Sequence, residues 1–149
     1  MALHTAGLVS DLSAANATAF HRIELNPVVL IHVTEVGVSM NAAPNSTLVP
    51  VEFNLQRNTL VGTGAAGTVA KIHSQGTAPQ ATALVENTAD GAGTITILHR
   101  WFVPVVSGMI WVAAPNREPD CIAAEFMGLK NQSALGASIN STQYLVWEE

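Results

Sequence analysis

The stretch that decides the fold is Val49-Pro50-Val51-Glu52-Phe53-Asn54-Leu55-Gln56, in which apolar and polar side chains alternate. Successive side chains of a β-strand point to opposite faces of a sheet, so this alternation predicts a strand with one buried face. The buried face would consist of Val49, Val51, Phe53 and Leu55, opposite Glu52, Asn54 and Gln56. Pro50 has no amide hydrogen, so we expect it at the start of the strand or on a sheet edge.

Strand-like patterns extend over most of the chain. Between Val28 and Val38 the apolar residues change parity once, near Glu35, which predicts one extra residue in a β-bulge. Weaker strand candidates are Gln80 to Glu86, Ile95 to Val103 (with Ile95, Ile97, Trp101 and Val103 on one face), Val105 to Ala113, Ile122 to Met127 and Gly136 to Trp147. With roughly eight candidates separated by Gly, Pro and Asn, the sequence predicts an all-β chain, a single jelly-roll-like β-sandwich.

The first 22 residues differ from the rest, because they are rich in Ala, Thr, Ser and Asn. We expect residues 1–22 to form an extended N-terminal arm that orders against a neighbouring molecule, and residues 23–149 to form the sandwich domain. A short helix from Asp11 to Phe20, capped by Ser10, is the alternative. The apolar anchors of this segment include Leu3, Leu8, Leu12 and Phe20.

Charged residues are scarce. They make up 11% of the chain, against 48% hydrophobic residues, and the net charge is −5. This balance argues against a nucleic-acid partner, which attracts a basic surface. Neutral polar side chains must cover most of the surface, which favours a protein packed against partner subunits, since interface cores are depleted of charge. A soluble monomer with an uncharged polar coat is the alternative.

Targeting segments are not expected. No segment reaches 18 uninterrupted apolar residues, so we expect no transmembrane helix. The first residues carry no Lys or Arg before an apolar run, so they do not resemble a secretory signal.

Motifs for catalysis or cofactor binding are weak. Gly62 to Gly67 matches a dinucleotide fingerprint, but no helix long enough follows, and Thr59 to Pro79 is predicted to be a long loop. The five histidines show no metal-ligand spacing, so a zinc site would require convergence of distant residues in the fold. Cys121 lies in an apolar stretch and is interpreted as a small buried side chain. We therefore expect neither an enzyme nor a bound cofactor or metal.

The large aromatic residues have two interpretations. Trp101, Trp111 and Trp147 lie at or near strand ends, where they would pack in the core or anchor a subunit interface. Trp147 is the best interface candidate of the three, because only two residues follow it. The complete set of candidate interface residues is Leu3, Leu8, Leu12, Phe20, Trp101, Trp111 and Trp147.

Several segments give the chain a resemblance to a known group of proteins. They are Phe53 to Asn58, Trp101 to Pro104, Pro115 to Glu118 and Val146 to Glu149. With the low charge and the strand pattern, they resemble the capsid decoration, or cement, proteins of tailed bacteriophages, including the cyanophage type. The resemblance covers about the last two-thirds of the chain and includes no catalytic motif.

This resemblance implies a structural role in the virion. Such proteins bind the outside of an expanded HK97-type shell, often as homotrimers, and tie neighbouring major capsid protein subunits together. It would place the protein on the capsid exterior after synthesis in the host cytoplasm, with no contact to nucleic acid or membrane. Two other functions stay open: a phage tail or fibre module that binds a host glycan, and a small hydrolase that uses scattered carboxylates or histidines.

Overall fold

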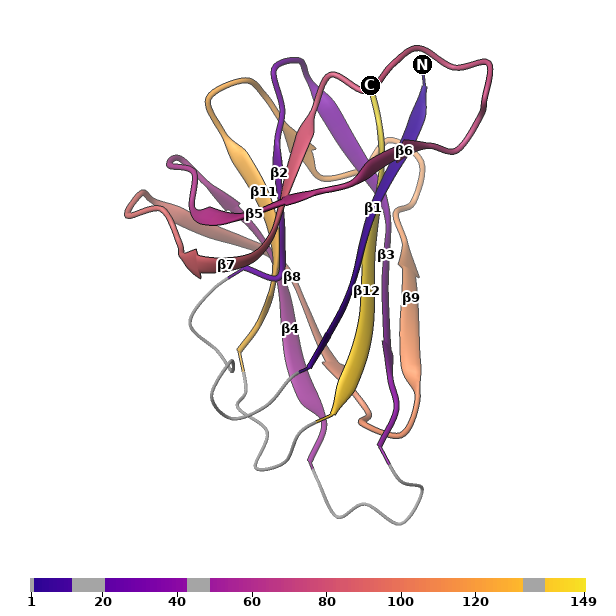
Figure 1. Ribbon diagram of the computed structural model, residues 1–149, viewed down its shortest axis with the longest axis vertical. Coiled ribbons are helices and arrows are strands. Elements are labelled where there is room, and N and C mark those ends of the chain that lie inside the picture. The colour runs from indigo at the N-terminus through magenta and orange to yellow at the C-terminus, as the bar shows by residue number, and fades with distance from the viewer. Residues whose placement is uncertain (1, 12–20, 43–48, 133–138) are drawn as a thin grey trace.

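The computed structural model describes residues 2–11, 21–42, 49–132 and 139–149. Within these residues the chain contains no helix, and twelve strands form two antiparallel sheets that face each other (Figure 1). The predicted all-β sandwich is therefore confirmed, with more strands than expected. The additional strands are short or lie where the sequence pattern is weak.

Sheet A has the strand order β10-β3-β12-β1-β6, and β9 also pairs with β3 beside β10. Its strands are β1 (Leu3–Asp11), β3 (Ile31–Met40), β6 (Val69–Lys71), β9 (Gly108–Val112), β10 (Asp120–Cys121) and β12 (Asn140–Glu148). Sheet B has the order β5-β7-β2-β11-β4-β8. Its strands are β2 (Ile23–Asn26), β4 (Val51–Asn58), β5 (Thr63–Gly67), β7 (Thr82–Ala89), β8 (Ile95–Val103) and β11 (Phe126–Asn131).

None of the strand pairings in the described residues joins two strands that are consecutive along the chain. The chain instead returns to each sheet after visiting other parts of the molecule, and β1 lies beside β12. As a result, the backbone of Ala2 and that of Glu149 exchange two hydrogen bonds, of 3.0 and 3.1 Å. A fold built from such long-range pairings must close large loops before its contacts form, which is typical of slow-folding β proteins.

The core lies between the two sheets. It is made of aliphatic and aromatic side chains that are completely buried, which gives the main driving force for folding. These include Ile23, Leu25, Ile31, Val33, Val36, Val51, Phe53, Leu55, Met127, Leu129, Leu145 and Trp147. Cys121 also lies here and is fully buried, as the sequence predicted.

The expected N-terminal arm is wrong for residues 3–11. These residues form β1, which pairs with β12 from Leu3 to Asp11 and on its other side with β6. Alternate side chains of β1 enter the core, and Ala6 is 1% exposed. Small residues fit here because β1 packs closely against its neighbours. The segment therefore has a low hydrophobicity, and its sequence did not indicate an interior strand. The helix proposed for Asp11 to Phe20 falls mostly on residues 12–20, outside the described residues.

Two details of the strand predictions are confirmed. The register of β3 against β12 shifts where Val146 pairs with Glu35 and Trp147 with Val33, which leaves Thr34 as an extra residue. This is the bulge predicted near Glu35. Pro50 immediately precedes β4, an interior strand, so it occupies the start of the strand rather than an edge.

Two expectations about β4 and β8 are corrected. The polar side of β4 is not solvated, because Asn54, Gln56 and Asn58 are buried on the outer face of sheet B. In β8 a register shift opposite Leu55 and Gln56 changes the face that the side chains occupy. Consequently Ile95 and Ile97 are exposed, while Val103 lies in the core.

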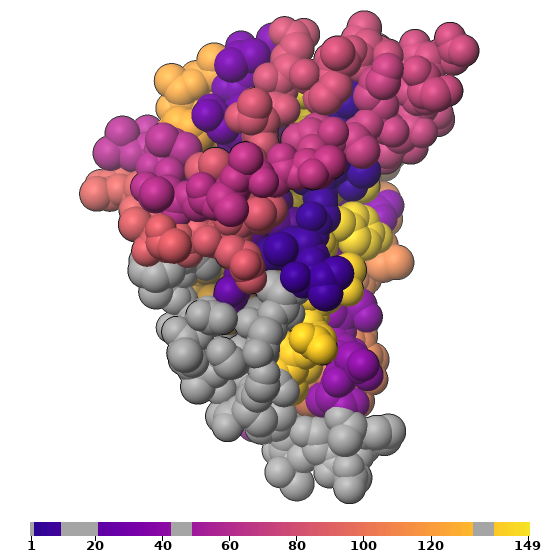
Figure 2. Space-filling view, in the orientation of Figure 1, coloured from indigo at the N-terminus to yellow at the C-terminus, as the bar shows by residue number. Residues whose placement is uncertain are grey.

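The expected long loop from Thr59 to Pro79 contains two short strands. β5 extends the edge of sheet B beside β7, and β6 extends sheet A beside β1. The segment therefore crosses from one sheet to the other, and Figure 2 shows it in magenta over one end of the molecule. The glycines of the Gly62 to Gly67 motif lie before and within a strand, not at a turn that opens a helix, so nothing in this geometry supports dinucleotide binding.

Candidate functional site

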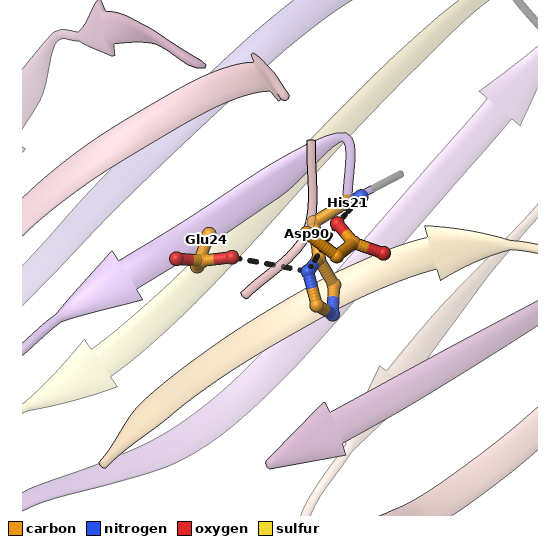
Figure 3. Close-up of side chains that lie close together, drawn as sticks. All are labelled: His21, Glu24 and Asp90. Atoms are coloured by element: carbon orange, nitrogen blue, oxygen red, sulfur yellow. Dashed lines mark hydrogen bonds and ion pairs between the residues drawn. The ribbon is translucent and has the colours of Figure 1, made fainter. Parts of the chain in front are cut away.

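A buried charged cluster lies on the outer face of sheet B (Figure 3). His21 precedes β2, Glu24 belongs to β2, and Asp90 follows β7. The His21 Nδ1 atom lies 2.9 Å from Asp90 Oδ1 and 3.0 Å from Glu24 Oε2. The side chains of His21 and Glu24 are completely buried, and that of Asp90 is 11% exposed. We call these three residues the His21 cluster.

Both carboxylates of the cluster are held by further donors. Glu24 accepts hydrogen bonds from the Gly62 backbone N–H at 2.8 Å and from the Asn87 side-chain amide at 2.9 Å. Asp90 accepts one from the His21 backbone N–H at 2.7 Å, and its Oδ2 pairs with Lys130 Nζ at 2.7 Å. Burying a carboxylate is costly unless such partners are present, so these contacts explain why both acids are tolerated.

The imidazole ring of His21 rests on Gly128 of β11. Gly128 pairs with Glu24 across the sheet, so both residues point to the same outer face of sheet B. A Cβ atom at position 128 would overlap the imidazole ring of His21. Glycine at this position therefore provides the space that the ring occupies.

The charges of the cluster balance when His21 is protonated, because His21 and Lys130 then face two carboxylates. Burial on its own would lower the pKa of His21, but the hydrogen bonds and charges of Asp90 and Glu24 outweigh it and raise the pKa from 6.5 to about 9. Burial would raise the pKa of Asp90, yet His21 and Lys130 lower it from 3.8 to about 2. The metal-free protein therefore carries a protonated, buried His21 at neutral pH.

These pKa values predict a pH-dependent stability. His21 has a higher pKa in the folded than in the unfolded chain, so its contribution is complete below pH 6.5 and is lost as the pH rises toward 9. The loss should approach about 3 kcal/mol of unfolding free energy. The contribution of Asp90 is complete above pH 3.8 and is lost as the pH falls toward 2. Urea unfolding of metal-free protein should therefore show greatest stability between these limits, whereas a flat profile from pH 6 to 9 would contradict the assignment.

A second feature is an exposed acidic pocket beside sheet A, with a volume of about 450 Å³. It is lined by His32, Asn116, Glu118, Asp120 and Glu148. His32 lies between Glu148 of β12 and Asp120 of β10 in the strand register, which brings distant carboxylates to one place. Arg57 pairs with Asp120 at 3.1 Å and partly neutralises it. The described residues that line the pocket offer polar and negatively charged groups.

The tryptophans predicted at an interface occupy two different environments. Trp147 is completely buried in the core and donates its indole N–H to Glu149, so its side chain is not on a surface that a partner can contact. Trp101 and Trp111 are half-buried and lie 5.5 Å apart between ring centroids, and the ring of His99 packs beside both, 4.5 Å from Trp111 and 5.6 Å from Trp101. They bring β8 of sheet B against β9 of sheet A and close this side of the sandwich.

The remaining interface candidates lie in β1 or beyond it. Leu3 and Leu8 are half-buried, and Leu8 packs against the core. Leu12 and Phe20 lie outside the described residues. Thus β1 uses its leucines largely for intramolecular packing.

Sequence analysis missed the most exposed apolar side chains of two edge strands, β8 and β9. In the described part of the chain, β8 pairs only with β4, and β9 only with β3. Phe102 on β8 is 65% exposed, and Ile110 and Val112 on β9 are 68% and 63% exposed. Ile95 and Ile97 on β8 are each 45% exposed. We call these five residues the apolar edge; by strand register, the three on β8 face outward from sheet B and the two on β9 face outward from sheet A. Their alternation was visible in the sequence, but which parity faces outward was not.

Cys121 does not have the environment of a reactive thiol. Burial, together with the nearby carboxylate of Glu125, raises its pKa to about 12. The thiolate form, which is the nucleophile, is therefore not populated at neutral pH.

Comparisons with known proteins give no relative from which a function can be transferred. No protein-family model matches the chain, and neither does any curated protein or solved structure. Over the residues that the structure describes, no helix has the length and apolar character required to cross a membrane. Any function must therefore be argued from the chain's own residues.

Proposed function

We propose that this chain is a structural virion protein that binds the outer surface of an HK97-type phage capsid and stabilises the coat lattice. The observation that carries the proposal is the apolar edge, five exposed large side chains on the edge strands β8 and β9. The sequence resemblance to capsid decoration proteins supports the same role.

Edge strands with exposed apolar side chains are normally protected. A soluble monomer usually places lysine, proline or other charges along such edges, because an uncovered apolar edge promotes association. Here β9 contains no charged residue, and β8 contains only Arg100, which pairs with Glu52 at 3.0 Å. An edge of this kind is suited to burial against another subunit.

The low charge of the whole chain supports repeated, weak contacts. Each copy would bury a modest interface, first in a homotrimer and then against the coat, and many copies would together stabilise the lattice. Neutral polar side chains lower the desolvation cost of such contacts relative to charged ones. The role requires neither catalysis nor a cofactor.

Charged substitutions in the apolar edge test the proposal. We expect Phe102→Glu and Val112→Glu each to weaken self-association at least tenfold in multi-angle light scattering, and to reduce co-sedimentation with expanded shells. Ile72→Glu is a matched control, because Ile72 is also exposed, at 44%, but follows β6 rather than lying on β8 or β9. A wild-type protein that stays monomeric and does not sediment with shells would overturn the proposal.

The acidic pocket favours a second candidate, a tail or fibre module that binds a host glycan. Carboxylates such as Asp120 and Glu148 can accept hydrogen bonds from sugar hydroxyls. Binding to a glycan array that is lost in Asp120→Asn but kept in Phe102→Glu would support this candidate over the capsid role.

A further inference from the structure

We propose that His21, Glu24 and Asp90 form a binding site for one divalent transition-metal ion. The site is separate from the apolar edge and does not depend on the proposed function. It lies on the outer face of sheet B and is formed by a residue before β2, a residue of β2 and a residue after β7.

The spacing of the three side chains fits such an ion. One nitrogen and two carboxylate oxygens lie within 4.8 Å of one another. His21 Nδ1 is 2.9 Å from Asp90 Oδ1 and 3.0 Å from Glu24 Oε2. Two ligands that bind at about 2.1 Å and about 90° from each other are roughly 3.0 Å apart, whereas tetrahedral ligands would be about 3.4 Å apart. The distances therefore favour a five- or six-coordinate ion with additional water ligands.

The state of the imidazole is an independent observation that points to an ion. The side chain of His21 is completely buried, and its Nδ1 atom lies within 3.0 Å of both carboxylates without pointing directly at either oxygen, while Nε2 has no partner among the described residues. Figure 3 shows the two carboxylates approaching Nδ1 from two sides. A buried polar atom without an aligned partner costs free energy, and a cation that displaces the Nδ1 proton would bind both the freed lone pair and the two carboxylate oxygens.

The surrounding contacts hold the ligands in place. Gly62 and Asn87 fix Glu24, while Lys130 and the His21 backbone fix Asp90. Hydrogen bonds of this kind orient the ligands of known metal sites and contribute to their affinity. Because Asp90 Oδ2 already pairs with Lys130, Asp90 would bind the ion through Oδ1 alone.

A proton and a metal ion compete for His21 Nδ1. Without an ion, the protonated ring and Lys130 balance the two carboxylates. With a divalent ion bound, the ring of His21 is neutral and becomes a ligand. The ion and Lys130 together then exceed the charge of the two carboxylates, so the cluster as a whole is positively charged. This repulsion favours a modest affinity and an exchangeable ion rather than one that is permanently bound. The partly exposed carboxylate of Asp90 provides the side from which the ion enters.

Titration of the chelator-treated, full-length chain with Co²⁺ tests the site. We expect one Co²⁺ per chain by calorimetry, a visible absorption spectrum of a five- or six-coordinate ion, and a higher melting temperature. His21→Ala and Glu24→Gln should each weaken binding at least tenfold. His73→Ala is the control, because His73 is exposed between β6 and β7 and should leave the affinity unchanged.

A measurement on the wild-type chain covers the case in which a variant does not fold. Substoichiometric Mn²⁺ should selectively broaden the NMR signals of the His21 ring. Broadening of His32 instead would place the ion in the acidic pocket and overturn the assignment. The absence of saturable Co²⁺ binding at millimolar concentration would also overturn it, leaving protonated His21 as the only occupied state.

Discussion

Replacing Glu24 with alanine is expected to lower the free energy of unfolding by roughly 3–5 kcal/mol, since it breaks a buried ion pair and leaves the other charges uncompensated. Glu24 is 0% exposed and accepts hydrogen bonds from Gly62 and Asn87 besides its contact with His21. The substitution would leave the buried Asn87 amide and the partly buried Gly62 N–H without their acceptor. Urea unfolding of metal-free protein, monitored by tryptophan fluorescence, measures the loss.

The matched control is Glu118→Ala, which removes a half-buried carboxylate in the loop between β9 and β10. Its effect should lie within about 1 kcal/mol of zero, because it breaks no buried ion pair. If Glu24→Ala and Glu118→Ala lowered the free energy of unfolding equally, the His21 cluster would not contribute to the stability of the fold as a buried ion pair.

Deletion of residues 1–11 is the second large effect, and it should abolish cooperative folding. The deletion removes β1, an interior strand, and leaves β12 and β6 without the partner that lies between them. It would also expose core side chains such as Leu145 and Trp147, whose strand pairs directly with β1. Circular dichroism should show the loss of native β structure, and thermal unfolding should lose its sharp transition.

A point substitution separates this effect from chain shortening. Ala6→Glu places a charge at a position that is 1% exposed, and it should destabilise the fold by several kcal/mol, on the order of the cost of an unpaired buried charge. Val9→Thr changes a side chain of the same strand that is 71% exposed, and it should be nearly neutral. A deletion variant with a native spectrum and an unchanged melting temperature would restore the interpretation of this segment as an arm.

The sequence predicted those parts of the fold in which local patterns are strong. The alternation around Phe53 correctly located β4, and the change of parity near Glu35 correctly located the bulge in β3. The pattern failed where side chains are small, because β1 places Ala6 in the core and β5 consists only of Thr, Gly and Ala. It also failed in β8, because no change of parity was recognised there to mark the register shift opposite Leu55 and Gln56.

The His21 cluster could not be found from spacing. His21 and Glu24 are three residues apart, but Asp90 and Lys130 join them only because β2, β7 and β11 are neighbours in sheet B. Within the described residues no strand pairs with the next strand along the chain, so the order of strands in the sequence does not predict this arrangement. The same limit applies to the acidic pocket, where His32, Asp120 and Glu148 meet through the pairing of β3 with β10 and β12.

Electron microscopy of expanded HK97-type shells, incubated with the purified protein, tests the central claim most directly. Under the proposed function, the shells would be assembled from the HK97-type coat protein of the same virus. We predict additional density on the outer surface at three-fold or quasi-three-fold positions. Strands β8 and β9 should form the contacts in this density, and the density should be absent when the Phe102→Glu variant is used. Shells that stay undecorated at saturating wild-type protein would contradict the account.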